Sequence, residues 1–374
     1  MTMDKKNSVG ASEELNIDPV IKGYIDENEQ KNEELRLEKE RDFMMPFDPD
    51  AILEVRHMRK CFPLQKSLFG KVQRELIAVE DVSFKLYAGE TLGIVGESGC
   101  GKTTLGRTIL KLHKPTGGQI IFDGKDITNY KTKDMKKLRT DMQIIFQDPY
   151  SSLPPRSTVG DILSEPVLVH NIVDKDQVKD YVLDLMDKCG LRDYYYERYP
   201  HEFSGGQRQR ICIARALSVN PKLVICDEPV SALDVSIQAQ IINLLKDLQK
   251  SLNLAYVFIS HDLSVVKFIS DKICVMYLGA VMEFGSKEDI FSNPLHPYTK
   301  ALFSAIPNPN PDVKMNRIVL KGDIPSPANP PKGCRFHTRC PYATEKCKYV
   351  TPTYKEYGNG HFAACHLLEE NEEK

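Results

Sequence analysis

The sequence lacks long apolar runs, a surplus of charge of either sign and an apolar segment near its start. Its apolar runs, such as residues 223–226 and 256–259, fall well short of the roughly 18–20 residues that span a bilayer. Fifty Lys and Arg against 52 Asp and Glu leave a net charge of −2, without the basic surplus of a nucleic-acid binder. The opening MTMDKKNSVG has no apolar core, unlike a signal peptide. We therefore expect neither an integral membrane protein nor a Sec-exported one.

The near-neutral total hides an acidic first segment. Residues 1–50 hold 7 Lys and Arg against 14 Asp and Glu, whereas the rest of the chain holds 43 against 38. The spacing of the charges permits one helix over residues 33–41. We nevertheless expect residues 1–48 to be a solvated, disordered arm, because their composition is too polar to bury a core. A membrane-surface helix is not expected, since anionic headgroups repel acidic side chains.

Short β-branched segments alternate with helical ones from about residue 52 onward. Strands are predicted at 52–56, 76–86, 91–95, 119–122, 143–146, 222–226, 255–260 and 272–276, and helices at 103–112, 176–189, 204–219 and 236–252. This alternation predicts an α/β fold with a largely parallel sheet. Residues 150–203 have weak strand signals and predict an inserted helical subdomain.

Proline and cysteine are concentrated near the end of the chain. Seven prolines lie within residues 306–331, which predicts a stiff linker over 301–332. Of the ten cysteines, six are scattered (positions 61, 100, 189, 212, 226 and 274). The chain length and the missing signal peptide disfavour a disulfide framework. We predict a small Cys-rich module over residues 333–368, followed by an acidic tail at 369–374; its four cysteines are Cys334, Cys340, Cys347 and Cys365.

A strand, a glycine-rich loop and a helix together form a phosphate-binding pattern. Strand 91–95 runs into the sequence GESGCGKT, the P-loop pattern. Its glycines let successive N–H groups point at phosphates, and the helix adds its positive end. Lys102 is expected to reach the β- and γ-phosphates, and Thr103 to offer its hydroxyl to Mg²⁺. The predicted nucleotide loop comprises Gly96, Ser98, Gly99, Cys100, Gly101, Lys102, Thr103 and Thr104.

A pair of acids, Asp227 and Glu228, follows the apolar run at 223–226. The acids emerge at the C-terminal end of this strand, where ligands of α/β sheets bind. Asp227 is expected to hold Mg²⁺, directly or through water, and Glu228 to polarise the attacking water as general base. An apolar strand followed by two acids is often only structural, and the preceding P-loop is what points to catalysis here.

A second glycine-rich helix start precedes that strand, in the sequence FSGGQ at 203–207. The side chain of Ser204 and the amides of Gly205 and Gly206, followed by Gln207, predict a second anion site. This loop resembles the signature loop of ATP-binding-cassette (ABC) ATPases, which usually begins with Leu where this chain has Phe203. Two sites that each bind part of a nucleotide suggest a head-to-tail dimer. The resemblance implies that one subunit's signature loop closes on the γ-phosphate held by the partner's P-loop.

The other motifs of this superfamily follow in order, and the resemblance implies their roles. Gln147, in IIFQDP, resembles the Q-loop glutamine that senses Mg²⁺ and the γ-phosphate near the transmembrane partner. Asp234, in SALD, resembles the D-loop residue, and His261 resembles the switch histidine that contacts the γ-phosphate. Phe62, after the first predicted strand, is a candidate for stacking on adenine, with core packing as the alternative. Residues 66–74 would then be an inserted loop.

The resemblance narrows to the oligopeptide/dipeptide permease ATPases and covers residues 52–368. It is carried by VGESGCGKTTLGRTIL, IIFQDPYSSLPPR, LDVSIQAQIINLL and NPLHPYTKALFSAIP, while LGRTIL and SLFGKV resemble the F-type subunit. It implies an ABC-type P-loop NTPase domain over residues 50–300, with an antiparallel β subdomain and a helical subdomain at about 150–218. The family usually has Asn-Pro-Arg where this chain has Pro154-Pro155-Arg156, near the expected permease contact.

The four C-terminal cysteines, Cys334, Cys340, Cys347 and Cys365, are spaced more widely than the tight pairs of zinc sites. Thiolates brought together by loops can hold zinc or an iron–sulfur cluster. Similar cysteines in peptide-permease ATPases are associated with a 4Fe-4S cluster, so the resemblance implies one, with zinc and free thiols as alternatives. We expect a structural role, because the nearest catalytic motif is far away in sequence.

These motifs predict an ATP-binding and ATP-hydrolysing subunit, using Mg²⁺, that powers import of oligopeptides or dipeptides. The resemblance implies a head-to-tail heterodimer with a D-type paralogue, two transmembrane permease subunits and an extracellular or periplasmic peptide-binding protein. It also implies a peripheral location on the cytoplasmic face of the cell membrane. No nucleic-acid partner is expected.

Three alternatives stay open at the level of sequence. Another cargo, such as nickel or a glycan, fits the same motifs, because the binding protein and membrane subunits choose the cargo. A soluble cassette ATPase of DNA repair or translation would have a long coiled coil or two cassettes, and this chain has neither. A nucleotide-binding regulator without hydrolysis is disfavoured by Lys102, Asp227, Glu228 and His261.

Overall fold

The structure is a computed structural model that describes residues 18–66, 72–306 and 317–372. Within these residues the central sheet has eight strands in the order β11-β12-β10-β9-β3-β8-β7-β6. The parallel strands are β9 (Lys272–Tyr277), β3 (Thr91–Val95), β8 (Ala255–Ile259), β7 (Leu223–Asp227) and β6 (Met142–Ile145). Every residue of β3, β7 and β8 is buried, as expected where both faces of a parallel sheet are covered. The predicted α/β fold is confirmed.

Three antiparallel strands extend one edge of this sheet: β10 (Ala280–Ser286), β12 (Phe362–Ala364) and β11 (Tyr354–Glu356). Strand β12 comes from the cysteine-rich end of the chain and pairs with β10 through Ala363 and Phe362. Two short strands of the predicted Cys-rich module at 333–368, β11 and β12, therefore belong to the central sheet.

A second, antiparallel sheet has the order β2-β1-β4-β5. It is formed by β1 (Ala51–Lys66), β2 (Val72–Tyr87), β4 (Gly117–Phe122) and β5 (Lys125–Asp126). This is the antiparallel β subdomain that the resemblance implies. Strand β1 runs ten residues beyond the predicted strand at 52–56, because bulges let it follow β2 through a bend. The predicted loop at 66–74 falls mostly on residues 67–71, which lie outside the described residues.

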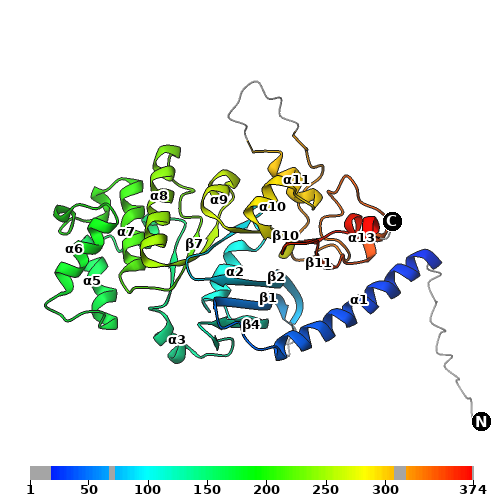
Figure 1. Cartoon of the computed structure of the whole chain (residues 1–374), viewed down its shortest axis with the longest axis horizontal. Helices are drawn as coiled ribbons and strands as arrows, with labels where there is room; N and C mark the ends of the chain where they lie inside the picture. Colours follow the sequence, from blue (N-terminus) through cyan, green and yellow to red (C-terminus); the bar gives the residue numbers. More distant parts are fainter. Residues whose placement is uncertain (1–17, 67–71, 307–316, 373–374) are drawn as a thin grey trace, which may run out of the picture.

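Helices cover both faces of the central sheet (Figure 1). α2 (Lys102–Ile109) follows β3, and α3 (Thr132–Leu138) precedes β6. A helical region at one end contains α4 (Pro149–Ser152), α5 (Val159–His170), α6 (Val178–Lys188) and α7 (Gly205–Leu217), as predicted for the inserted subdomain. The remaining helices are α8 (Val235–Leu252), α9 (Leu263–Ile269), α10 (Lys287–Ser292), α11 (Pro297–Phe303), α12 (Lys346–Tyr349) and α13 (His366–Glu372).

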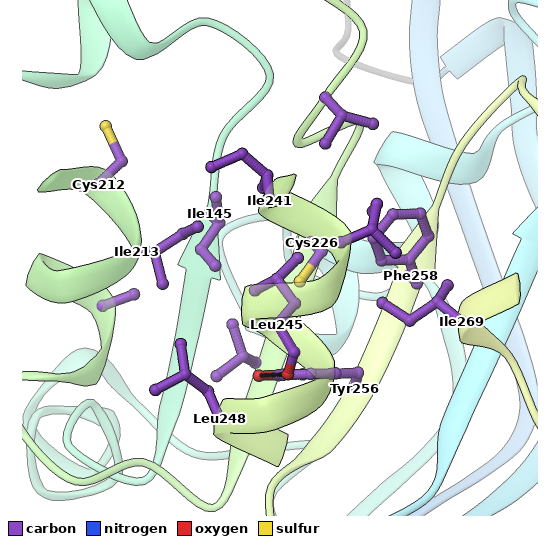
Figure 2. Close-up of a cluster of buried hydrophobic side chains, with 14 of the residues drawn as sticks. Ile145, Cys212, Ile213, Cys226, Ile241, Leu245, Leu248, Tyr256, Phe258 and Ile269 are labelled. Carbon is purple, nitrogen blue, oxygen red and sulfur yellow. Dashed lines mark hydrogen bonds between the residues drawn. The ribbon is translucent and has the colours of Figure 1, made fainter. Parts of the chain in front are cut away.

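Strand β8 separates two hydrophobic cores. Tyr256 and Phe258 point to one face, into a core shared with α7 and α8, whereas Val257 points to the other, toward α2 and the β subdomain. Figure 2 shows the first core, where the Tyr256 hydroxyl donates to the Leu245 carbonyl at 3.1 Å. The labelled side chains are Ile145, Cys212, Ile213, Cys226, Ile241, Leu245, Leu248, Tyr256, Phe258 and Ile269. These cores fix the strand ends that carry the polar motif residues.

The 26-residue helix α1 (Pro19–Met44) lies along the outside of the molecule, from the C-terminal region to β1 (Figure 1). Asp18 caps its first turn and Pro19 occupies its first position. At the C-terminal end of the helix, the buried Arg56 guanidinium donates hydrogen bonds to the carbonyls of Asp42, Met45 and Pro46. A cation at a helix C-terminus satisfies carbonyls that the helix leaves unpaired.

Helix α1 contacts the body through aromatic and charged side chains: Tyr24 stacks on Tyr349, and Phe43 packs edge-on against His57. Its start contacts the C-terminal region through a salt bridge from Lys346 to Glu27 at 2.8 Å and a hydrogen bond from the Thr351 N–H to Asn28 at 2.9 Å. Its end contacts the β subdomain, where Lys39 lies 3.1 Å from Asp81. The prediction of a disordered arm is therefore wrong for residues 19–44, and residues 1–17 lie outside the described residues. No helix in the described part of the chain has the length and hydrophobicity to cross a membrane.

Candidate functional site: a phosphate loop and a polar strand edge

The glycine-rich loop lies between β3 and α2, as the sequence predicts. Gly101 has φ +103°, and a Cβ atom there would lie 2.0 Å from the Ala78 carbonyl oxygen, so only glycine fits. Lys102 is buried, and its ammonium donates to the carbonyls of Gly96 at 2.8 Å and Glu97 at 3.2 Å. Cys100 is buried too, and burial raises the pKa of its thiol. Ser98 and Gly99 are exposed, while Thr103 and Thr104 are half-buried.

The Thr103 hydroxyl donates to the Asp227 carboxylate at 2.6 Å, joining the loop to the end of β7. Burial raises the pKa of Asp227, although the bond from Thr103 and the nearby Arg107 guanidinium oppose the shift. Hydroxyl and carboxylate oxygens are ligands that Mg²⁺ prefers, with waters and substrate phosphates completing its shell. These two side chains therefore fit the magnesium site that the sequence predicts.

Three predicted catalytic residues meet at one carboxylate oxygen. The Gln147 amide donates to Glu228 Oε2 at 3.0 Å, and His261 Nδ1 lies 3.2 Å from the same oxygen. Glu228 has φ +50°, and its N–H donates to the Ile259 carbonyl of β8, which fixes the turn after β7. Gln147 and His261 are exposed, so this group faces solvent at the edge of the sheet. The three residues come from the ends of three neighbouring strands, β6, β7 and β8.

The second anion site opens α7, as predicted. Ser204 is the N-cap, and its hydroxyl and N–H exchange hydrogen bonds with Gln207. Gly206 needs its small size, because a Cβ there would lie 2.5 Å from the Ile237 side chain. Phe203, the departure from Leu, is buried and packs edge-on against Tyr195 with ring centroids 5.0 Å apart. Asp234 is exposed at the start of α8.

Phe62 lies within β1, and not after it as expected. Its half-buried ring contacts the His113 ring edge-on, with centroids 5.4 Å apart, and the Lys60 ammonium lies 4.5 Å from its centroid. The ring therefore has polar neighbours, Lys60 over one face and His113 edge-on, at the surface of the β subdomain.

Sequence reasoning missed Glu97, which occupies the loop between Gly96 and Ser98. Its carboxylate accepts two hydrogen bonds from the Arg339 guanidinium, at 2.6 and 3.1 Å. Its N–H donates to the Tyr298 hydroxyl at 3.0 Å. Glu97 and Arg339 are 242 positions apart in the sequence, which hid this pair; the one sequence signal was an acid in a loop that binds phosphates.

The four C-terminal cysteines lie in one region next to this loop, although the sequence predicts no contact with a catalytic motif. Burial raises the pKa of Cys334 to about 12, and the thiols of Cys347, Cys365 and Cys340 add to the shift. In the described part of the chain, no group of three or more His, Cys, Asp or Glu side chains is placed to hold a metal ion. The arrangement therefore does not support the predicted iron–sulfur or zinc site.

Two protein-family models match the chain. The model described as "ABC transporter" matches residues 79–231, which hold the phosphate loop, the signature loop and the two acids. The model described as "Oligopeptide/dipeptide transporter, C-terminal region" matches residues 282–347, which run from β10 through Arg339 to Cys347.

Individual relatives agree with these models. The chain is 55% identical to the "Oligopeptide transport ATP-binding protein AppF" of Bacillus subtilis, across 87% of this chain and 99% of the relative. It is 50% identical to the "Dipeptide transport ATP-binding protein DppF" of Escherichia coli, across 86% and 96%.

Solved structures share the fold. The chain resembles cbiO1 from Clostridium perfringens, part of the ABC transporter complex cbiONQ, with a TM-score of 0.57 and 30% identity over 65% of this chain and 92% of that chain. It also resembles the dimeric ATP-binding cassette MJ0796 bound to ADP and Pi, with a TM-score of 0.56 and 26% identity over 63% and 98%.

Proposed function

This chain belongs to the ATP-binding subunits of oligopeptide and dipeptide ABC import transporters, and from that premise we propose how its own residues bind and hydrolyse ATP. As a member of this family it is an ATP-hydrolysing translocase subunit. The observation that supports our assignment best is the meeting of Gln147 and His261 at Glu228, beside the bonded pair Thr103 and Asp227.

In the proposed site, the loop from Gly96 to Thr104 surrounds the phosphates with its backbone N–H groups. Lys102 exchanges its bonds to the Gly96 and Glu97 carbonyls for bonds to the β- and γ-phosphates. Thr103 and Asp227, with Gln147, would hold Mg²⁺, which would neutralise phosphate charge. Phe62 stacks on the adenine from the β subdomain.

Glu228 serves as the general base in this proposal. Its carboxylate accepts a proton from the attacking water, while Gln147 and His261 hold that carboxylate in place and contact the γ-phosphate side. Because both neighbours touch the same Oε2, the other carboxylate oxygen is the one we assign to water.

The test compares Glu228→Gln with Glu288→Gln, a matched change at an exposed glutamate on α10. After photo-crosslinking with azido-ATP in the assembled transporter, the nucleotide retained on this chain is identified. Glu228→Gln should leave labelling intact and retain ATP, with hydrolysis reduced about 10²–10⁴-fold, as for loss of a general base. Glu288→Gln should retain ADP like the wild type. ADP retained on the Glu228→Gln chain would mean that hydrolysis continues without this carboxylate, and Glu228 would then not be the general base.

We also propose that the site is completed by another subunit. Ser204, Gly205 and Gly206 open α7, where the Ser204 hydroxyl accepts from the Gln207 N–H of the same turn, and the loop at Gly96 is a separate anion site. A head-to-tail partner, which we take to be a D-type paralogue, would bring its own signature loop and D-loop to this chain's phosphates. Asp234 lies exposed where such a partner would contact it.

The finer assembly is likewise a proposal. Two transmembrane permease subunits and an extracellular or periplasmic peptide-binding protein would complete the transporter, with this chain peripheral on the cytoplasmic face. The family and the peptide-transport names of the relatives support it. We propose the functional division as residues 50–300 for the ATPase, 301–332 for the linker and 333–368 for the Cys-rich region.

We propose a metal at Cys334, Cys340, Cys347 and Cys365 only in a rearranged conformation of this region; the four thiols act on one another's charge and so share one part of the fold. Binding would require the thiols to move together, since they are not placed as a metal group. Iron and zinc analysis of anaerobically purified protein tests it. About one metal centre per chain would support the proposal, and absence of both metals would end it.

A further inference from the structure

The C-terminal region reaches into the phosphate loop, and we propose that Arg339 is a positioning residue for ATP binding that acts by pairing with Glu97. This inference rests on the proposed nucleotide site. It adds that ATP affinity also depends on a segment that carries none of the ATPase motifs. Arg339 lies between Cys334 and Cys347, in the region matched by the oligopeptide/dipeptide C-terminal model.

The contact has the geometry of a strong pair. Arg339 Nη1 and Nη2 donate to the two oxygens of the Glu97 carboxylate at 2.6 and 3.1 Å. The arginine side chain is only 9% exposed, and the glutamate is 25% exposed. A bidentate guanidinium–carboxylate pair fixes orientation as well as distance, and partial burial limits its screening by salt.

Glu97 is also held through its backbone, by Tyr298 of α11 and by the phosphate-binding Lys102. Its N–H donates to the Tyr298 hydroxyl of α11, and its carbonyl accepts from the Lys102 ammonium. A shift of Glu97 therefore moves the backbone next to Gly96 and changes where Lys102 is held before ATP binds. Through these contacts Arg339 sets the shape of the loop.

The pair also reduces the repulsion between the Glu97 carboxylate and the phosphates of ATP. A carboxylate within a loop that binds a triphosphate repels the ligand, and at short range this repulsion lowers affinity. Arg339 neutralises the charge of the Glu97 carboxylate through its two hydrogen bonds. Without Arg339, Glu97 would be an unpaired acid beside the phosphates, so the loss should appear mainly as weaker ATP binding.

Neighbouring contacts keep Arg339 in place. Phe336 is buried and packs on the rings of Tyr277 and Tyr298, with centroids 5.4 and 5.2 Å apart. Arg335 donates to the Leu278 carbonyl and pairs with Glu80 of β2. The segment from Arg335 to Arg339 thus touches β2, α11 and the end of β9, three elements that surround the loop.

The same segment is tied to the cysteines. The Cys334 N–H donates to the Cys347 carbonyl at 2.9 Å, and Arg339 directly precedes Cys340. A change in the conformation of the cysteine region therefore acts on the phosphate loop through Arg339. This gives the C-terminal region a route to adjust ATP binding without contacting the nucleotide.

The test is a double-mutant cycle on the full chain with its partner subunits, reading ATP affinity with a fluorescent nucleotide, ATPase kcat and KM, and Tm. Arg339→Gln should raise the ATP Kd and KM about tenfold, with a smaller change in kcat. Adding Glu97→Gln should restore most of the affinity, because it removes the unpaired charge. Arg339→Lys should lie between, since lysine keeps the charge but not the bidentate contact.

The control is Lys348→Gln, which removes an exposed pair with Glu345 in the same region and should change neither constant. If Arg339→Gln lowers Tm and kcat together and Glu97→Gln restores nothing, Arg339 is merely structural and the inference is wrong. Unchanged Kd in Arg339→Gln also overturns it. Lys102→Ala separates the two proposals: if that variant binds ATP normally, the nucleotide site itself is misassigned.

Discussion

At the scale of single residues, the sequence predicts the motif side chains well because each motif is local. Gly101, Lys102 and Thr103 are consecutive, and their chemistry can be read without knowing the fold. Glu97 could not be explained that way, because its partner Arg339 is 242 residues away and belongs to no nucleotide-binding pattern. Phe62 was placed wrongly after its strand, since the bulges that lengthen β1 leave no sequence signal.

Gly101→Ala tests the shape of the phosphate loop. A Cβ there would lie 2.0 Å from the Ala78 carbonyl oxygen at a positive φ, so the loop must open. We expect ATP affinity to fall about tenfold or more, consistent with the cost of a strained backbone. Isothermal titration with ATP measures it.

The matched control is Gly124→Ala, where φ is +71° and no atom lies within 4 Å of the added Cβ. It shares the backbone strain but lacks the clash, and it lies in the turn after β4, away from the loop. Affinity should stay at the wild-type value. Equal affinities for the two alanine variants would show that the clash at Gly101 has no effect on the site.

At the scale of elements, the parallel strands and the helices between them follow from apolar runs and their spacing. Strand β10 was missed because Glu283 interrupts its pattern. That glutamate is fully buried and accepts bonds from the N–H groups of Leu295 and His296, while His361 contacts it from the C-terminal region. Helix α1 was missed for a related reason: complementary charges on the body hold it, and these come from distant segments.

The docking of α1 should depend on pH through His57 of β1. Burial alone lowers the pKa of His57, but its bonds to Asp81 and to Asp42 of α1 outweigh burial and raise it, with Lys39 opposing. The part of the raise that comes from Asp42 depends on docking, so protonated His57 stabilises the docked helix below the ordinary value of 6.5, and this stabilisation is lost as pH rises through the raised value. Protection factors of α1 amides in hydrogen exchange should therefore fall between pH 6 and pH 9.

His57→Gln provides the comparison, since it keeps hydrogen bonding but cannot titrate. Its α1 protection factors should be lower than those of the wild type at pH 6 and should not fall further by pH 9. Equal α1 protection in the wild type at both pH values would contradict this account of the helix. So would a full pH dependence in the variant.

At the scale of the whole molecule, the fold brings segments that are distant in the sequence next to the phosphate loop. β3 and α2 supply the loop itself, the ends of β6, β7 and β8 supply Gln147, Glu228 and His261, and the C-terminal region supplies Arg339. The alignment with the relative from Bacillus subtilis spans 87% of this chain and 99% of the relative's length. The near-neutral net charge likewise divides into an acidic first segment and a mildly basic remainder.

The central claim is that ATP hydrolysis at this chain's phosphate loop powers peptide import. It is tested most directly by measuring ATP hydrolysis in the assembled transporter. The rate is measured with and without peptide-loaded binding protein, for the wild type and for Lys102→Ala in this chain alone. We predict that peptide raises the wild-type rate, and that Lys102→Ala removes this increase. An increase of wild-type size in the Lys102→Ala transporter, or no response to any peptide in the wild type, would contradict the account.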